Sequence, residues 1–280
     1  MKNFRHPLLF LSLYCLLTGC ATRKYQDLAY LAPTPITTAI PKLNVFVPRH
    51  PNPAKLPILL FIHGGNWNSG TKNTYVLLGR NFAKKGVITI IPDYTLSPLA
   101  NYDQQTQQIA AAIQWTITHA AQYGGDPQRI YITGHSAGGH LAALAVMNPK
   151  YGIDPKTIAG IILNDAAGLD MQHYLEEYPP TAENNYDTTW TNDPKQWHNA
   201  SPIYFITKDT PPIMMYVGDK TYASIKDGNR RFLDALHPFE PTVVAIRLNK
   251  AHIPMVLQYF WPFSNRFGEV KEFMEVTSLR

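Results

Sequence analysis

Cysteine is scarce in this chain of 280 residues: it occurs only at positions 15 and 20. Because both cysteines lie close to one end, the rest of the chain has neither a disulfide framework nor a cysteine metal site. Charge is also sparse. Asp, Glu, Lys and Arg make up 16% of the residues, and the net charge is +5. The basic residues are scattered and form no stripe with interleaved aromatics, which excludes the usual nucleic-acid-binding pattern. No internal repeat is present.

The first twenty residues have the composition of a targeting segment. Lys2 and Arg5 precede an apolar run over residues 8–17, and Leu-Thr-Gly leads directly into Cys20. The run is too short to span a bilayer comfortably and predicts a signal peptide. The last positions resemble the lipobox of bacterial lipoproteins. The alternative is an ordinary signal peptide with an incidental cysteine.

The lipobox resemblance implies removal of residues 1–19, a lipid on Cys20 and a membrane partner through that lipid anchor. It places the protein at the bacterial cell envelope, facing the periplasm or the exterior. The residue after Cys20 is Ala21 and not an aspartate. By analogy with the sorting of enterobacterial lipoproteins, this favours the outer membrane over the inner one. Residues 20–42 are polar and dotted with proline, so we expect a tether between lipid and domain.

The remaining residues, 43–280, alternate between strand and helix patterns. Hydrophobic residues make up 45% of the chain, which is enough for a sizeable core. Continuous apolar runs such as residues 58–62 are typical of strands buried on both faces of a parallel sheet. The alternation predicts an α/β fold with a doubly wound, mostly parallel sheet. Residues 166–204 break the pattern and predict a small cap insertion, with an irregular surface excursion as the alternative.

A lone serine stands between glycines in the segment 134–138, Gly-His-Ser-Ala-Gly. A buried strand pattern precedes it and a helix pattern follows. A sharp turn at this point exposes the serine above the sheet, and glycines are needed because the turn leaves no room for neighbouring side chains. Ser136 is therefore the candidate nucleophile. The alternative is a structural serine in a glycine-rich turn.

A second glycine-rich segment, His63-Gly64-Gly65-Asn66, directly follows another buried strand. Acyl transfer needs two N–H donors that face the developing oxyanion. The backbone of Gly65 and Asn66, together with that of Ala137, can supply them. We interpret His63 as a residue that orders this loop.

With these two motifs the chain resembles the α/β-hydrolase superfamily, in the esterase/lipase branch with a His-Gly-Gly loop. Residues 124–144 (GGDPQRIYITGHSAGGHLAAL) are close to that branch's pattern, and residues 92–98 (PDYTLSP) are similar to its Asp-Tyr-Arg-Leu-x-Pro signature. The resemblance covers roughly residues 43–276 and implies the α/β-hydrolase fold. It also implies a nucleophile, an acid and a histidine in that order along the chain. His252 follows the last predicted strand and is the candidate base, ahead of His140 and His237.

Several carboxylates are candidates for the acid. The family pattern places an aspartate about three residues beyond the glycine that ends the strand before it, and that position is Thr221 here. Asp219 is the nearest carboxylate and is the predicted acid. The alternatives are Asp165, after the preceding strand, and two aspartates on the following helix, Asp227 and Asp234.

The resemblance implies a serine hydrolase that cleaves a small-molecule carboxylic ester through an acyl-enzyme, with no cofactor and no metal. One alternative is an amide, formamide or peptide hydrolase with the same catalytic residues. Another is a catalytically silent envelope binding protein, which the displaced acid would favour. The oligomeric state is left open.

Overall fold

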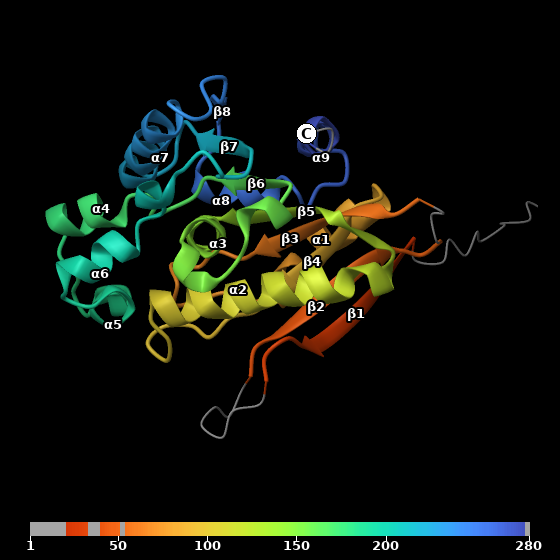
Figure 1. Ribbon diagram of the computed structural model, residues 1–280, viewed down its shortest axis with the longest axis horizontal. Helices are drawn as coiled ribbons and strands as arrows, with labels where there is room; N and C mark the ends of the chain where they lie inside the picture. Colours follow the sequence, from red (N-terminus) through yellow and green to blue (C-terminus); the bar gives the residue numbers. More distant parts are fainter. Residues whose placement is uncertain (1–20, 33–39, 51–53, 278–280) are drawn as a thin grey trace, which may run out of the picture.

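The computed structural model describes residues 21–32, 40–50 and 54–277. Within these residues eight strands form one sheet, in the order β1-β2-β4-β3-β5-β6-β7-β8 (Figure 1). Their bounds are β1 Thr22–Ala29, β2 Lys42–Pro48, β3 Leu56–Ile62, β4 Ile88–Pro92, β5 Gly125–His135, β6 Gly160–Asn164, β7 Ile213–Gly218 and β8 Ala245–Leu248.

The six strands from β3 to β8 run parallel. At one side of the sheet β2 runs antiparallel to β4, and β1 runs antiparallel to β2 and so in the direction of the parallel strands. Residues 58–62 of β3 are almost completely buried, as the continuous apolar run predicts. Their side chains alternate between the two faces: Leu60 packs in the core on one side of the sheet and Phe61 in the core on the other. The predicted mostly parallel α/β sheet is confirmed.

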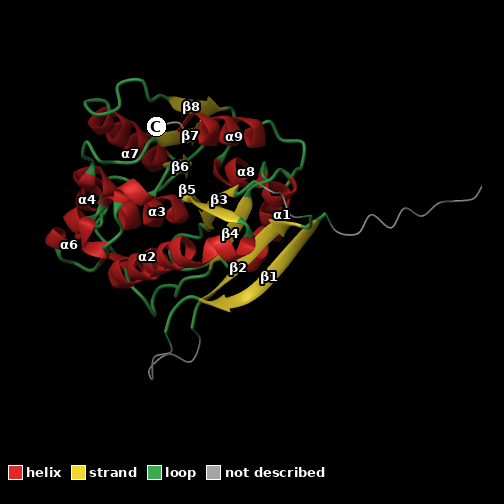
Figure 2. Cartoon of the chain, turned by 45° about the vertical axis from the view of Figure 1, so that its right-hand side comes forward, coloured by secondary structure: helices red, strands yellow, loops and turns green. Residues whose placement is uncertain are grey.

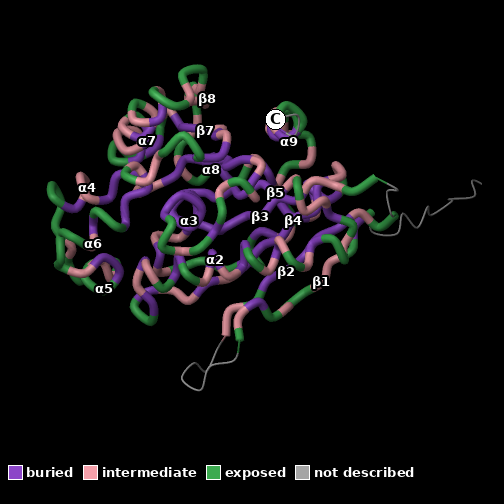
Figure 3. The backbone as a smooth tube through the Cα atoms, viewed as in Figure 1, coloured by how far each residue is buried: buried purple, intermediate pink, exposed green. Residues whose placement is uncertain are grey.

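Helices cover both faces of the sheet (Figure 2). One face packs against α2, α3 and α7, and the other against α1, α8 and α9. The bounds of these helices are α1 Val76–Lys84, α2 Tyr102–His119, α3 Ala137–Met147, α7 Ala223–Leu236, α8 His252–Leu257 and α9 Arg266–Thr277. Every residue of α3 is buried, so this helix lies at the centre of the molecule (Figure 3).

The cap insertion folds as three short helices: α4 Met171–Glu177, α5 Tyr186–Trp190 and α6 Pro194–Asn199. They lie together at one end of the molecule (Figure 1). Trp190 is fully buried, with its ring 4.6 Å from that of Trp67 and 5.5 Å from that of Tyr102. Aromatic packing therefore holds this segment against the sheet domain, and it is not an irregular surface excursion.

The segment predicted as a tether, residues 20–42, contains a strand of the sheet. Strand β1 pairs antiparallel with β2, with Thr22 opposite Pro48, so the prediction of a linker there is wrong for residues 22–29. An edge strand is half exposed and needs no continuous apolar run, which is why the polar sequence did not reveal it. Residues 33–39 lie outside the described part of the chain, as do residues 1–20 with the predicted signal peptide and Cys20.

Candidate active site

Ser136 lies in the sharp turn between β5 and α3. Its backbone has φ 55° and ψ −124°, a strained conformation for a residue with a side chain. A Cβ atom at Gly134 would lie 2.2 Å from the carbonyl carbon of Gly138, and one at Gly138 would lie 2.1 Å from the carbonyl oxygen of Ile62. Both flanking positions therefore require glycine. The strain is typical of a turn that holds a nucleophile above a sheet.

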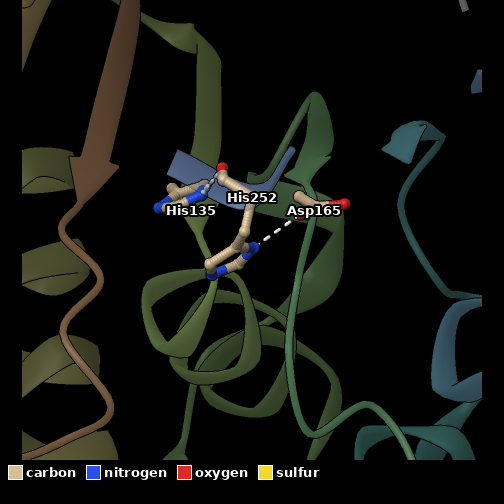
Figure 4. Close-up of side chains that lie close together, drawn as sticks. All are labelled: His135, Asp165 and His252. Carbon is tan, nitrogen blue, oxygen red and sulfur yellow. Dashed lines mark hydrogen bonds and ion pairs between the residues drawn. The ribbon is translucent and has the colours of Figure 1, made fainter. Parts of the chain in front are cut away.

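His252 lies against Ser136. Its Nε2 is 2.8 Å from the Ser136 Oγ, within hydrogen-bond distance. His252 begins α8, just after β8, so the sheet brings together two residues that are 116 positions apart. The His135 Nε2 lies 3.0 Å from the His252 carbonyl oxygen, and the two rings are 4.5 Å apart (Figure 4).

Asp165 completes the chain of contacts. Its Oδ2 is 2.6 Å from the Nδ1 of His252 (Figure 4). It follows the last residue of β6, and its carboxylate is fully buried. The backbone N–H of Gly218 donates to Oδ1 at 2.9 Å, and the hydroxyl of Thr221 donates to Oδ2 at 2.5 Å. The buried charge is thus hydrogen-bonded on both oxygens, as a desolvated carboxylate must be.

Asp219, the predicted acid, is not placed beside His252. Its Oδ1 accepts hydrogen bonds from Arg247 at 2.8 Å, and its side chain is 38% exposed. The N–H of Asp219 bonds to the carbonyl of Leu248 at 2.7 Å and so continues the pairing with β8. This pairing directs the carboxylate toward Arg247 on the neighbouring strand. The choice of Asp219 is therefore corrected to Asp165, which was an alternative on sequence grounds.

The other carboxylates that were considered lie away from the site. Asp227 and Asp234 both bind Arg230 across consecutive turns of α7 and are exposed to solvent. They are surface ion pairs of a kind that contributes little to stability.

The histidines near the serine, apart from His252, have structural contacts. Burial lowers the pKa of His135 and that of His140 to about 4, so both rings are neutral near pH 7. His140 Nδ1 accepts from the Trp67 indole at 3.2 Å, and its Nε2 is 2.7 Å from the Ala200 carbonyl oxygen. Burial also lowers the pKa of His63, whose Nδ1 lies 2.9 Å from the Gly64 carbonyl oxygen.

The loop after β3 approaches the nucleophile closely. A Cβ at Gly64 would lie 3.1 Å from the Cβ of Ser136. Gly65 has φ 131°, and its carbonyl accepts the N–H groups of Asn68 and Ser69, which closes a tight turn. Gly65, Asn66 and Ser136 all line one cavity. Ala137 is the first residue of α3, so its N–H has no acceptor within the helix.

The cap is bonded to this loop. The hydroxyl of Tyr186 in α5 donates to the Asn66 Oδ1 at 2.7 Å. The Asn68 side-chain amide donates to the Asn184 carbonyl at 2.8 Å. Sequence reasoning did not single out Tyr186, because neither spacing nor motif indicates which cap tyrosine reaches the loop.

The cavity above Ser136 has a volume of about 670 Å³. Its wall carries several aromatic side chains: Trp67, Tyr75, Tyr174, Tyr186, Tyr222 and Phe260. None of its described lining residues is a lysine or arginine, and its one carboxylate, Asp170, is bound by Arg231 at 2.6 Å. The cavity therefore suits a neutral, partly apolar molecule of modest size.

His135, Asp165 and His252 offer possible metal-ligand atoms within 4.8 Å of one another. Their contacts nevertheless fit another role better. The Nδ1 of His252 faces Asp165, its Nε2 faces Ser136, and His135 Nε2 contacts a backbone carbonyl. This arrangement is that of a nucleophile, a base and an orienting acid. That the chemistry needs no metal or cofactor stays a prediction.

The BD-FAE family model matches residues 43–223, well over half of the chain. Esterase LipQ of Mycobacterium tuberculosis is 30% identical over 214 residues, which cover 71% of this chain and 50% of LipQ. Kynurenine formamidase of Danio rerio is 29% identical over 140 residues, covering 49% of this chain and 45% of the formamidase. The chain thus spans half or less of the length of these relatives.

The fold has counterparts among solved structures. Esterase B of Lactobacillus rhamnosis, in a structure with a tributyrin phosphonate inhibitor, superposes with a TM-score of 0.76. The superposition covers 92% of this chain and 87% of that esterase, at 21% sequence identity. This likeness shows the fold, and the family model covers the loop after β3, the serine turn and Asp165. The chain belongs to the BD-FAE family, within the esterase/lipase group of α/β-hydrolases.

Proposed function

We propose that this protein is a serine hydrolase that cleaves neutral carboxylic esters through an acyl-enzyme. The observation that carries the proposal is the continuous contact from Ser136 through His252 to Asp165, beside a cavity of about 670 Å³ that Ser136 and His252 line. An esterase relative and the family match support the same reaction class.

In the first half of the reaction, His252 Nε2 takes the proton of Ser136 as Oγ attacks the ester carbonyl carbon. Asp165 holds the imidazole through Nδ1 and stabilises its cationic form. The N–H groups of Gly65, Asn66 and Ala137 stabilise the tetrahedral oxyanion. The intermediate collapses to a Ser136 ester, and the alcohol leaves with the proton from His252.

In the second half, water attacks the carbonyl carbon of the Ser136 ester. His252 takes a proton from this water as the bond forms. Collapse of the second tetrahedral intermediate releases the carboxylic acid and returns the proton to Ser136. Protons and bonds balance over the cycle, and no further reactant is required.

The two alternative functions, a silent binding protein and an amide or formamide hydrolase, differ in the observations that support them. The silent binding protein was suggested by the displaced acid, and that reason disappears because Asp165 occupies the acid's place. An amide or formamide substrate has the support of the formamidase relative. Since the serine mechanism is the same for either bond, the substrate must be decided by assay.

The assay compares p-nitrophenyl acetate with p-nitroacetanilide, followed by p-nitrophenyl esters of increasing acyl length, with Ser136→Ala as control. We expect hydrolysis of the ester that is lost in the control. Turnover of the anilide alone would overturn the ester proposal. Turnover of neither substrate, together with no fluorophosphonate adduct on Ser136, would overturn the hydrolase itself.

Tyr186→Phe tests the role of the loop after β3. The change removes the hydrogen bond to Asn66 and leaves the ring in place. If the Asn66 N–H serves the oxyanion, we expect kcat for p-nitrophenyl acetate to fall about 10-fold, the rate equivalent of one hydrogen bond. The matched control is Tyr178→Phe, on an exposed cap tyrosine, with no expected effect. Equal rates for both variants and the unmodified protein would contradict the role.

We further propose that the protein acts at the bacterial cell envelope, held by a lipid on Cys20 at an outer membrane. None of the described helices has the length and apolar character to span a bilayer. Strand β1 begins at Thr22, which lies on the side of the sheet where the parallel strands have their N-terminal ends. Ser136 lies on the opposite side, just beyond the C-terminal end of β5. An anchor at Cys20 would therefore leave the cavity facing away from the membrane. Cys20→Ser should move the protein from the membrane to the soluble fraction; an unchanged distribution contradicts the anchor.

A further inference from the structure

Thr221 lies beside Asp165 and His252, but it has no part in the catalytic cycle proposed above. It is buried, and it lies in the turn between β7 and α7. Its hydroxyl is 2.5 Å from the Asp165 Oδ2 and 3.3 Å from the His252 Nδ1. A single side chain therefore contacts both the carboxylate and the imidazole that the carboxylate orients.

The turn after β7 donates a hydrogen bond to each oxygen of the Asp165 carboxylate. The backbone N–H of Gly218 donates to Oδ1, and Thr221 donates to Oδ2. Thr221 is itself fixed by its N–H, which bonds to the Gly218 carbonyl at 3.3 Å. Because the Asp165 side chain has no contact with water, these donors replace the hydration that holds an exposed carboxylate.

The orientation of Thr221 is specific within its turn. Asp219, two residues earlier, directs its carboxylate to Arg247. Thr221 instead directs its oxygen into the space between Asp165 and His252.

We propose that Thr221 is a positioning residue, whose hydroxyl holds the Asp165 carboxylate against His252. The proposal rests on the hydrolase function proposed above. It assigns the β7–α7 turn a part in catalysis that is separate from the nucleophile, base and acid.

The test compares Thr221→Val with Thr221→Ser in hydrolysis of p-nitrophenyl acetate. Valine keeps the shape and removes the hydroxyl, and we expect kcat to fall about 10- to 100-fold with KM within about two-fold. Serine retains the hydroxyl and is expected to stay within about three-fold of the unmodified protein. A valine variant with an unchanged kcat overturns the positioning role. So does a fall in kcat that serine does not rescue.

The outcomes separate this inference from the function on which it rests. If the unmodified protein hydrolyses no ester and takes up no fluorophosphonate, the hydrolase function and the inference fall together. If the unmodified protein is active and Thr221→Val is equally active, the inference alone falls.

Discussion

Asp165→Asn is expected to lower kcat for ester hydrolysis by about 10⁴-fold, whereas Asp219→Asn stays within about two-fold of the unmodified protein. Asparagine has almost the same shape as aspartate but carries no charge, and its amide can donate a hydrogen bond to the imidazole Nδ1. It therefore favours the wrong tautomer of His252 and no longer stabilises the imidazolium. Steady-state rates with p-nitrophenyl acetate measure both variants.

Comparison of the two variants distinguishes Asp165 from Asp219 as the residue that orients His252. Asp219 is the matched control because it lies at the end of the adjacent strand, is the same residue type and pairs with Arg247 instead of His252. Its loss removes only an exposed ion pair, which contributes little. A large fall in kcat for Asp219→Asn with a near-normal rate for Asp165→Asn would return the acid role to Asp219.

Ser136→Ala is expected to lower kcat by about 10⁶-fold and to abolish covalent labelling by a fluorophosphonate. The change removes the atom that attacks the carbonyl, so no acyl-enzyme forms. A small rate above that of water is expected to remain, because the cavity and the oxyanion donors still bind the ester. Intact-protein mass spectrometry measures the label, and a burst of p-nitrophenol measures acyl-enzyme formation.

A second serine of the same cavity provides the control. Ser224 lines the same wall, but the hydroxyl within hydrogen-bond distance of the His252 Nε2 is that of Ser136. Ser224→Ala is expected to keep both the label and the burst. Retention of the label in Ser136→Ala, or its loss in Ser224→Ala, would show that Ser136 is not the nucleophile.

Most of the fold follows from the sequence because parallel strands and their covering helices leave strong local patterns. The apolar run at 58–62 predicts a strand buried on both faces, and β3 is that strand. Strand β1 was missed for the opposite reason. It lies at the edge of the sheet with much of its surface exposed, so its polar residues resemble a linker. The strand forms because its backbone pairs with that of β2, and no pattern in the sequence of residues 22–29 alone indicates this pairing.

The site could be predicted to the extent that its residues carry local signals. The spacing of Gly134 and Gly138 around Ser136 is a local signal, although the group that excludes a side chain at Gly138 is the Ile62 carbonyl at the end of β3. His252 could be placed because it follows the final strand. The acid could not be chosen, since Asp165 and Asp219 each directly follow a parallel strand and both satisfy the order of the chain.

By itself, therefore, the sequence determines a parallel α/β sheet with a serine turn, a glycine-rich loop after β3 and a histidine beyond the last strand. The tertiary structure alone decides which carboxylate faces that histidine, which cap residue contacts the loop and which threonine holds the acid. The reason is geometric. Spacing along the chain determines how far a residue lies beyond a strand, but the direction of its side chain depends on its pairing with the adjacent strand. For Asp219 that pairing leads to Arg247, and for Asp165 the turn after β7 supplies the donors that direct it to His252.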